Sequence, residues 1–284
     1  MYNCLHVGFF LRTTLSELEA ELGGLTLDRH FYDNGSQCCK GRTLIGSFRE
    51  SLPPRLKLRL RTIAHPVRTW KANSHLRALY PASWRWIALS QNIQGFLTVA
   101  EADELYRLAR DFTPNNSPVA VELGSWKGKS SVMLAGGLLG KIAPRLFCVD
   151  PFGCDESLEY QKKYYDPLLQ QDPRDLQAVF KSNMRSCGAD HIAVPLKSYS
   201  FELCSCWSHA IDLLFIDANH EYESVLRDFN DWFRFVKKGG VVALHDVGGE
   251  FEGPLRVVAE KLKPPLFDAV RLVDSLAWGV KTGS

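Results

Sequence analysis

Two hydrophobic periods alternate along the chain after about residue 90. Short and nearly continuous apolar runs, typical of strands buried on both faces, begin at residues 119, 145, 191, 211 and 241. Between them apolar residues recur every three or four positions, as on one face of a helix, most clearly over 221–236. Strands that alternate with helices predict a parallel sheet with right-handed crossovers.

The last two apolar runs, 267–272 and 277–281, are joined by a short turn, which predicts an antiparallel edge strand. We therefore predict an α/β fold: a doubly wound, seven-stranded, mostly parallel sheet with one antiparallel edge strand, formed by residues 91–284. Residues 1–90 are predicted to form a basic, partly irregular N-terminal appendage. Thr98 and Glu101 have the spacing of a capping box and predict the start of a helix. Basic residues followed by glycines at 237–240 predict the end of the helix over 221–236.

The first ninety residues carry other patterns. Residues 13–22 predict a short amphipathic helix, and the alternating Arg, Lys and Leu of 55–61 predict a strand with one basic face, although a helix would also suit them. Between Arg42 and Arg85 ten Lys or Arg stand against Glu50 alone, a net charge of +9 in a chain of net charge +2. This segment either contacts an anionic partner or forms a solvated face, and we expect the solvated face.

Four aromatic residues follow the alternating residues 55–61, and they either line an acceptor pocket or pack the appendage onto the domain: Trp70, Tyr80, Trp84 and Trp86. We expect packing. No aromatic-interleaved RNA-binding motif accompanies the basic residues, so nucleic acid is not an expected partner.

Composition narrows the class of protein. With 284 residues, of which 45% are hydrophobic and 23% charged, the chain has an ordinary globular composition. No apolar run in it has the roughly 18 to 20 residues that cross a bilayer. The eight cysteines include no Cys-x-x-Cys pair, so we expect reduced thiols rather than disulfides or a zinc site. These features predict a cytoplasmic protein without a membrane span.

One stretch, V-A-V-E-L-G-S-W-K-G-K-S-S over 119–131, predicts a strand, a glycine turn and a helix start. Glycine lets a ligand approach the backbone, and the free N–H groups of a helix start attract electron-rich groups. Trp126 stands where a dinucleotide fingerprint needs glycine. The turn by itself is therefore a weak signal for a ligand site, because many strand-to-helix turns contain glycine. Asp150, 28 residues after Glu122 at the end of the next strand, can accept hydrogen bonds from ribose hydroxyls. Turn and acid together predict a nucleoside site.

Four motifs in this order carry a resemblance: E-L-G-S-W-K-G-K-S, F-C-V-D-P-F, L-L-F-I-D-A-N-H-E-Y and G-G-V-V-A-L-H-D. They resemble the class I S-adenosylmethionine-dependent methyltransferases, in particular the small-molecule O-methyltransferase-like branch, over residues 93–281. The resemblance implies a Rossmann-like fold and S-adenosylmethionine as cofactor. It also implies a set of cofactor-binding residues: Glu122, with Gly124, Ser125 and Gly128 at the methionine part, Asp150 at the ribose, and Ser198 near the adenine, where the usual acidic residue is absent.

The strand ends predict the chemistry. Carboxyl ends of parallel strands share one edge of a sheet, so the polar residues that end these strands are expected to converge: Glu122, Asp150, Asp217, His245 and Asp246. Methyl transfer to a hydroxyl needs the acceptor's proton removed, for which His220 or His245, with Asp217, are candidates.

A metal is the competing expectation. By resemblance, Asp217 and Asp246 stand where metal-dependent relatives bind Mg²⁺, but His245 departs from the oxygen pair of those relatives. We rank a histidine base and metal assistance as nearly equal. Either histidine could instead only fix the rim loops.

The predicted activity is methyl transfer to a hydroxyl oxygen of a small molecule or sugar. Two alternatives stay open: a nucleoside-binding or scaffold module without turnover, and an NAD-dependent oxidoreductase, against which Trp126 and the rim residues argue. The sequence leaves a homo-oligomer open.

Overall fold

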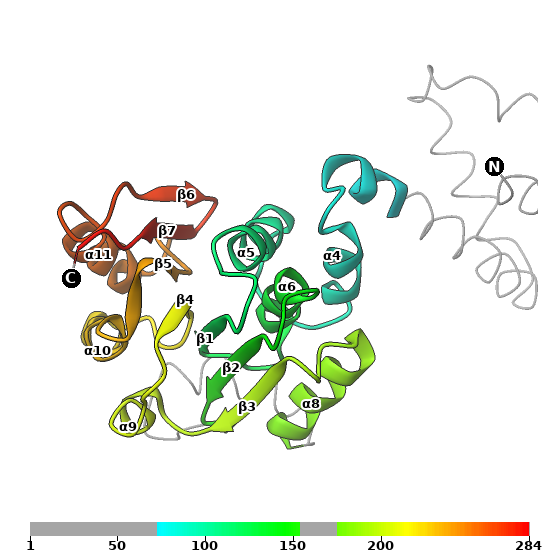
Figure 1. The fold of residues 1–284 in the computed structure, drawn as a ribbon, viewed down its shortest axis with the longest axis horizontal. Helices are drawn as coiled ribbons and strands as arrows, with labels where there is room; N and C mark the ends of the chain where they lie inside the picture. Colours follow the sequence, from blue (N-terminus) through cyan, green and yellow to red (C-terminus); the bar gives the residue numbers. More distant parts are fainter. Residues whose placement is uncertain (1–72, 154–174, 284) are drawn as a thin grey trace, which may run out of the picture. The chain divides into compact units, whose positions relative to one another are not determined.

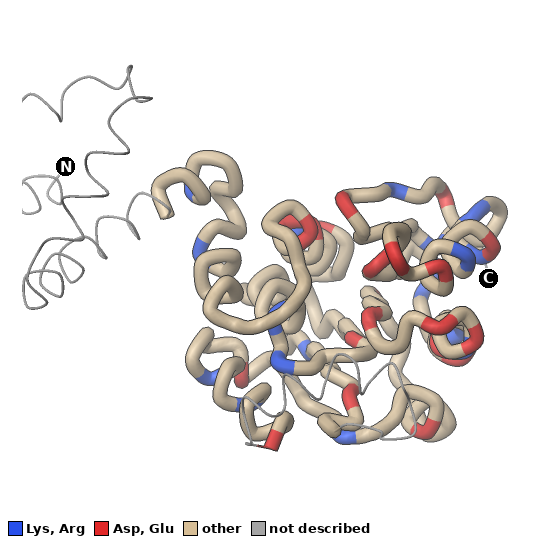
Figure 2. Tube along the Cα trace, turned by 180° about the vertical axis from the view of Figure 1, so that it is seen from behind, with Lys and Arg blue, Asp and Glu red and all other residues tan. Residues whose placement is uncertain are grey.

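In the computed structural model of the chain, the described residues are 73–153 and 175–283. The predicted helix over 13–22, the strand over 55–61 and Trp70 lie outside them. Lys and Arg are interspersed with Asp and Glu over the described part (Figure 2). Eight of the ten basic residues counted between Arg42 and Arg85 precede residue 73. No helix among the described residues is long and apolar enough to cross a membrane.

Seven strands form one sheet in the order β3-β2-β1-β4-β5-β7-β6 (Figure 1). The strands are β1 (Val119–Leu123), β2 (Arg145–Asp150), β3 (Ala193–Lys197), β4 (Ile211–Ile216), β5 (Val236–Leu244), β6 (Arg271–Val273) and β7 (Leu276–Val280). β1 to β5 pair in parallel, whereas β7 runs antiparallel to both β5 and β6. This confirms the predicted fold class, with β7 as the antiparallel strand of that edge. The order reverses at β1, where β2 lies on one side and β4 on the other.

Helices cover both faces of the sheet (Figure 1). On one face lie α4 (Trp84–Ser90), α5 (Val99–Asp111), α6 (Lys129–Leu138) and α8 (Leu176–Cys187), and on the other α9 (Ser200–Leu203), α10 (Tyr222–Phe233) and α11 (Glu252–Lys261). Alternate residues of β1 supply both cores: Ala120 packs with the first group, and Val119 and Val121 with the second. The sheet is therefore buried on both sides, as its continuous apolar strands predict.

α4 belongs to the first core although it precedes residue 91. The Trp86 ring packs on Gly136 of α6, where an added Cβ would lie 2.5 Å from the indole Cγ. Trp86 and Ile87 are both buried, which agrees with packing rather than pocket lining for Trp86. The domain boundary at residue 90 stays a prediction.

The helix-ending interpretation of residues 237–240 is wrong. α10 already ends at Phe233, and these residues belong to β5, which begins at Val236. A register shift between β4 and β5 lies opposite them. The buried Asp212 carboxylate of β4 accepts hydrogen bonds from Lys237 Nζ at 2.7 Å and from the Val119 backbone N–H at 2.8 Å. Lys237 therefore pairs with a carboxylate in the sheet and does not cap a helix.

The capping box of α5 is confirmed: Thr98 Oγ1 accepts from Glu101 N–H, and the Glu101 carboxylate accepts from Thr98 N–H. Glu101 also accepts from the backbone and hydroxyl of Ser275, in the turn between β6 and β7. One side chain thus joins a helix start to the far edge of the sheet.

We expect Trp86→Ala to lower the free energy of unfolding by about 3–5 kcal/mol, because it leaves a cavity against Gly136 in the first core. Trp84→Ala, two positions earlier on a partly exposed side chain, is the matched control and should cost far less. Urea denaturation of both variants measures the difference. Equal stability of the two variants would contradict a core role for α4.

Candidate active site

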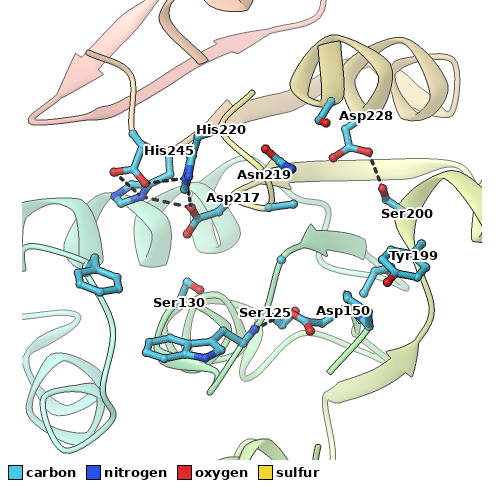
Figure 3. A pocket seen from close by; sticks show the side chains of 18 of the residues that line it. Ser125, Ser130, Asp150, Tyr199, Ser200, Asp217, Asn219, His220, Asp228 and His245 are labelled. Carbon is cyan, nitrogen blue, oxygen red and sulfur yellow. Dashed lines mark hydrogen bonds and ion pairs between the residues drawn. The ribbon is translucent and has the colours of Figure 1, made fainter. Parts of the chain in front are cut away.

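A cavity of about 610 Å³ lies where the strand order reverses, at the carboxyl ends of β1, β2, β4 and β5 (Figure 3). Its volume falls within the range of roughly 300–1,000 Å³ usual for small-ligand sites. Eight of the ten predicted site residues line it: Gly124, Ser125, Asp150, Ser198, Asp217, His220, His245 and Asp246. Glu122 and Gly128 do not.

The two predicted glycines shape the turn for packing reasons. Gly124 has φ +87°, and a Cβ there would lie 2.1 Å from the Asp217 carbonyl oxygen, so only glycine lets the ends of β1 and β4 come this close. Gly128 has φ +88° and precedes α6; a Cβ there would lie 2.4 Å from Met184 Cε. Gly128 therefore contacts α8 and not the cavity.

Glu122 lies beneath the turn and is fully buried. Its carboxyl accepts from Ser130 Oγ at 2.6 Å and from Ser131 Oγ, both in the first turn of α6. Burial raises the pKa of this carboxyl to about 7, although the serine hydrogen bonds oppose the rise. Glu122 thus holds the first turn of α6 from the buried side, opposite the cavity.

Asp150 is held rigidly at the cavity wall. Its Oδ2 accepts from Trp126 N–H at 2.8 Å and its Oδ1 from Phe152 N–H at 2.6 Å, and the side chain is 4% exposed. Burial raises its pKa against the effect of these backbone donors. The Ser198 N–H donates to the Asp150 carbonyl at 3.2 Å, which places the loop after β3 beside it.

His245 sits among three carboxylates. Its Nε2 is 3.3 Å from Glu101 Oε2, and its Nδ1 is 3.4 Å from Asp217 Oδ1 and 3.5 Å from Asp246 Oδ1. Burial lowers the pKa of the imidazole, but the carboxylates overcome this and raise it to about 12. The ring is therefore a cation at neutral pH. The pKa of Glu101 falls to about 2, since the hydrogen bonds from His245 and Ser275 outweigh the effect of burial.

His220 occupies the cavity side of the same cluster (Figure 3). Its Nε2 is 2.9 Å from Asp246 Oδ2 and 4.0 Å from Asp217 Oδ1, and its ring stacks on Phe251 at 4.3 Å. Asp246 has φ +56°, a strained conformation for a residue with a side chain, and its carboxylate reaches both histidines. Ligand atoms of Asp217, His220 and Asp246 lie within 4.8 Å of one another, close enough to hold a metal ion.

The sequence did not indicate several residues that line the cavity or support it from behind. Phe96 is 72% exposed and stacks on Trp126 with ring centroids 6.0 Å apart. These two rings and Phe251 line the cavity, a role that the sequence offered only as the alternative for four earlier aromatic residues. Glu101 was visible only as a capping residue. Asp228 belongs to no motif, so the sequence indicated only that it lies in a helix.

Comparison with known proteins gives the site a context. Residues 121–247 match the family described as "Methyltransferase domain", a stretch that includes most of the cavity lining. An uncharacterized protein of Acanthamoeba polyphaga mimivirus is 28% identical over 131 residues, which are 44% of this chain and 50% of that protein. The chain thus spans about half the length of this curated relative.

Among solved structures, the cofactor-bound Rv0187 from MTB is similar with a TM-score of 0.50 and 16% identity, covering 72% of this chain and 91% of that one. An O-methyltransferase from Bacillus cereus, solved in complex with SAH, has a TM-score of 0.48 and 13% identity, covering 74% and 91%. Residues 121–247 therefore match a methyltransferase domain, and the fold of the chain is similar to that of the cofactor-bound structure.

The buried Glu122 predicts a pH dependence of stability. Its pKa in the folded state, about 7, lies above the ordinary value of 4.5, so between these values the folded chain keeps a proton that the unfolded chain has released. Stability therefore falls as pH rises from about 4.5 through 7. We expect wild type to lose up to about 3 kcal/mol of unfolding free energy over this range that Glu122→Gln does not lose.

Urea denaturation at several pH values measures this difference, and the other titrating groups cancel because both proteins share them. Glu202→Gln, on an exposed residue of α9, is the control and should follow wild type. Parallel pH profiles for wild type and Glu122→Gln would show that folding does not raise the pKa of Glu122.

Proposed function

We propose that this cavity transfers the methyl group of S-adenosylmethionine to a hydroxyl oxygen of a small molecule or sugar. The observation that carries the proposal is that one cavity holds both a rigid carboxylate beside a glycine turn and, a few side chains away, an imidazole paired with carboxylates. The first suits a nucleoside and the second suits proton removal from an acceptor.

The residues around the turn fit the donor. Each Asp150 oxygen accepts one backbone N–H and has a further lone pair for a ribose hydroxyl. At the start of α6, the helix N-terminus with Lys129 and Ser130 faces the cavity and suits the carboxylate of a methionine moiety. Bound there, the donor supplies a methyl group on a cationic sulfur that needs no activation by the protein.

His220 is the better of the two candidate bases. The ion pairs of His245 hold its proton, so it cannot accept another. His220 is paired with Asp246, which orients the ring and stabilises the imidazolium that forms on proton transfer. In this proposal His245 keeps Asp217 and Asp246 in place, and these carboxylates position His220.

A divalent metal is the competing role for the same side chains. The trio of Asp217, His220 and Asp246 is compact enough, but Mg²⁺ prefers oxygen ligands, and the His245 cation already neutralises both carboxylates at 3.4–3.5 Å. The residues present therefore fit Mg²⁺ poorly. Zn²⁺, for which imidazole and carboxylate are usual ligands, would fit the trio better.

The aromatic wall supports a small flat acceptor or a sugar, since Phe96 and Trp126 offer ring faces at the cavity. Binding without turnover and an NAD-dependent reaction are the alternative functions. The experiments below separate them. A cytoplasmic location remains part of the proposal.

We expect calorimetry on the full chain to show micromolar binding of S-adenosylmethionine and no comparable binding of NAD. Asp150→Ala should weaken the binding by about tenfold or more, because it removes charge-assisted hydrogen bonds. Asp150→Asn, which keeps one oxygen acceptor, should weaken it less. Asp190→Ala, on an exposed residue that does not line the cavity, should bind like wild type. Preference for NAD, or no binding of S-adenosylmethionine, would refute the proposed donor.

We expect His220→Asn to lower turnover of a hydroxyl acceptor by about 10²–10⁴-fold, the usual contribution of a general base, with little change in S-adenosylmethionine affinity. Transfer of labelled methyl groups to a panel of phenols and sugars measures turnover, and calorimetry measures affinity. Dialysis against EDTA should leave wild-type turnover unchanged. Loss of turnover with EDTA, restored by a divalent metal, would assign Asp217, His220 and Asp246 to a metal instead. Donor binding with no transfer to any acceptor would favour a binding module.

A further inference from the structure

The most exposed large apolar side chain among residues 73–153 and 175–283 lies at the cavity. Phe96, in the segment between α4 and α5, is 72% exposed and lines the cavity together with its neighbours Gly95 and Leu97. Single exposed apolar residues are common on protein surfaces. At a cavity, however, an exposed ring is a face that a ligand can cover. The contacts that hold the ring in place distinguish these two cases.

Two lysines fasten the segment that carries Phe96 to the glycine turn. Lys127 Nζ donates to Gln94 Oε1 at 2.8 Å, and Lys129 Nζ donates to the Gly95 carbonyl oxygen at 3.1 Å. Gly95 also packs closely on Lys129, since an added Cβ would lie 2.9 Å from Lys129 Cδ. Both lysines of the turn therefore hold the two residues that directly precede Phe96, and this fixes the position from which its ring extends.

The Phe96 ring held in this way lies nearly parallel to the Trp126 ring. Their centroids are 6.0 Å apart and their planes differ by 11°, within the range in which aromatic rings interact. Trp126 is itself fixed, because its backbone N–H donates to the Asp150 carboxylate and Lys127 Nζ lies 5.0 Å from its ring centroid. The two rings are thus arranged in advance, so little freedom is lost when a flat ligand stacks on them.

The polar groups beside these two rings are already engaged with one another. Lys127 and Lys129 bind within the segment, and Thr98 Oγ1 donates to the Asp274 carboxylate at 2.8 Å and accepts from Glu101 N–H. A sugar needs hydrogen-bond partners for its hydroxyl groups, because burial of an unpaired hydroxyl costs free energy. A flat apolar ring needs only the faces of other rings. These contacts therefore favour an aromatic acceptor over a sugar.

We propose that Phe96 determines the acceptor specificity of the cavity, and that with Trp126 it forms the face on which the ring of a phenolic acceptor stacks. The segment that carries Phe96 leads into α5, where Glu101 contacts His245. It thus connects the turn beside Asp150 with the charged cluster around the proposed base. The inference rests on the proposed function and narrows its acceptor to an aromatic hydroxyl compound.

The test compares naphthol with its fully saturated analogue decalinol, which has the same two-ring skeleton and hydroxyl but is not flat. Calorimetry is done on the full chain saturated with S-adenosylhomocysteine, so that the donor part of the cavity is occupied. We expect wild type to bind naphthol about three- to tenfold more tightly than decalinol, because only the flat ring stacks, and to bind methyl glucoside more weakly than naphthol.

Three variants locate the source of this preference. Phe96→Leu keeps an apolar side chain but removes the ring face, and it should reduce the preference for naphthol about threefold. Phe96→Trp, which keeps a ring face, should retain the preference. Leu272→Ala, on an exposed apolar residue of β6 that does not line the cavity, should keep the wild-type ratio.

The outcomes for the acceptor and for the donor can be told apart. Phe96→Leu that keeps the wild-type ratio would overturn the role of Phe96 and leave the proposed function standing. Wild type that binds naphthol no better than decalinol or methyl glucoside would have the same consequence. Failure to bind S-adenosylhomocysteine would refute the proposed function itself, and the inference with it. An unchanged affinity of Phe96→Leu for S-adenosylhomocysteine shows that this variant folds.

Discussion

The site depends on the burial of one positive charge. His245, at the end of β5, is 3% exposed, and only its pairing with Glu101, Asp217 and Asp246 makes such burial tolerable. These partners come from α5, from the end of β4 and from the residue after His245 itself. The buried charge therefore holds together segments that are far apart in the sequence. Glu101 extends the network to Ser275 beyond β6. The geometry around His220 is a consequence, because the carboxylates that orient it are fixed from behind by His245.

The cavity has two parts with different physical characters. Around Asp150 the walls are set by backbone hydrogen bonds and by the close contact at Gly124, which leave little freedom. Elsewhere they consist of charged side chains around His220 and of aromatic rings, including the exposed Phe96. A fixed part suits a constant ligand, such as a cofactor. A part formed by side chains can change with the acceptor while the sheet stays the same.

The sequence indicated those residues whose position follows from a strand end. Asp150, Asp217, His245 and Asp246 each follow an apolar run, and parallel strands bring such ends together regardless of the loops. Glu101, Phe96 and Asp228 lie on helices or loops, and only tertiary packing decides which of their neighbours they meet. The lysines and glycines of 237–240 show the limit of local signals, since basic residues before glycine suit an irregular strand as well as a helix end. Gly128 and Glu122 were found by motif, but packing turned both away from the cavity.

Trp126 belongs to both parts of the cavity at once. Its backbone N–H is bonded to the Asp150 carboxylate, and its ring stacks under Phe96. It is held at φ +42°, a conformation that side-chain-bearing residues rarely adopt, so it has few alternative positions. The ring is therefore fixed relative to the Asp150 carboxylate, and at this residue the two parts of the cavity cannot shift independently of each other.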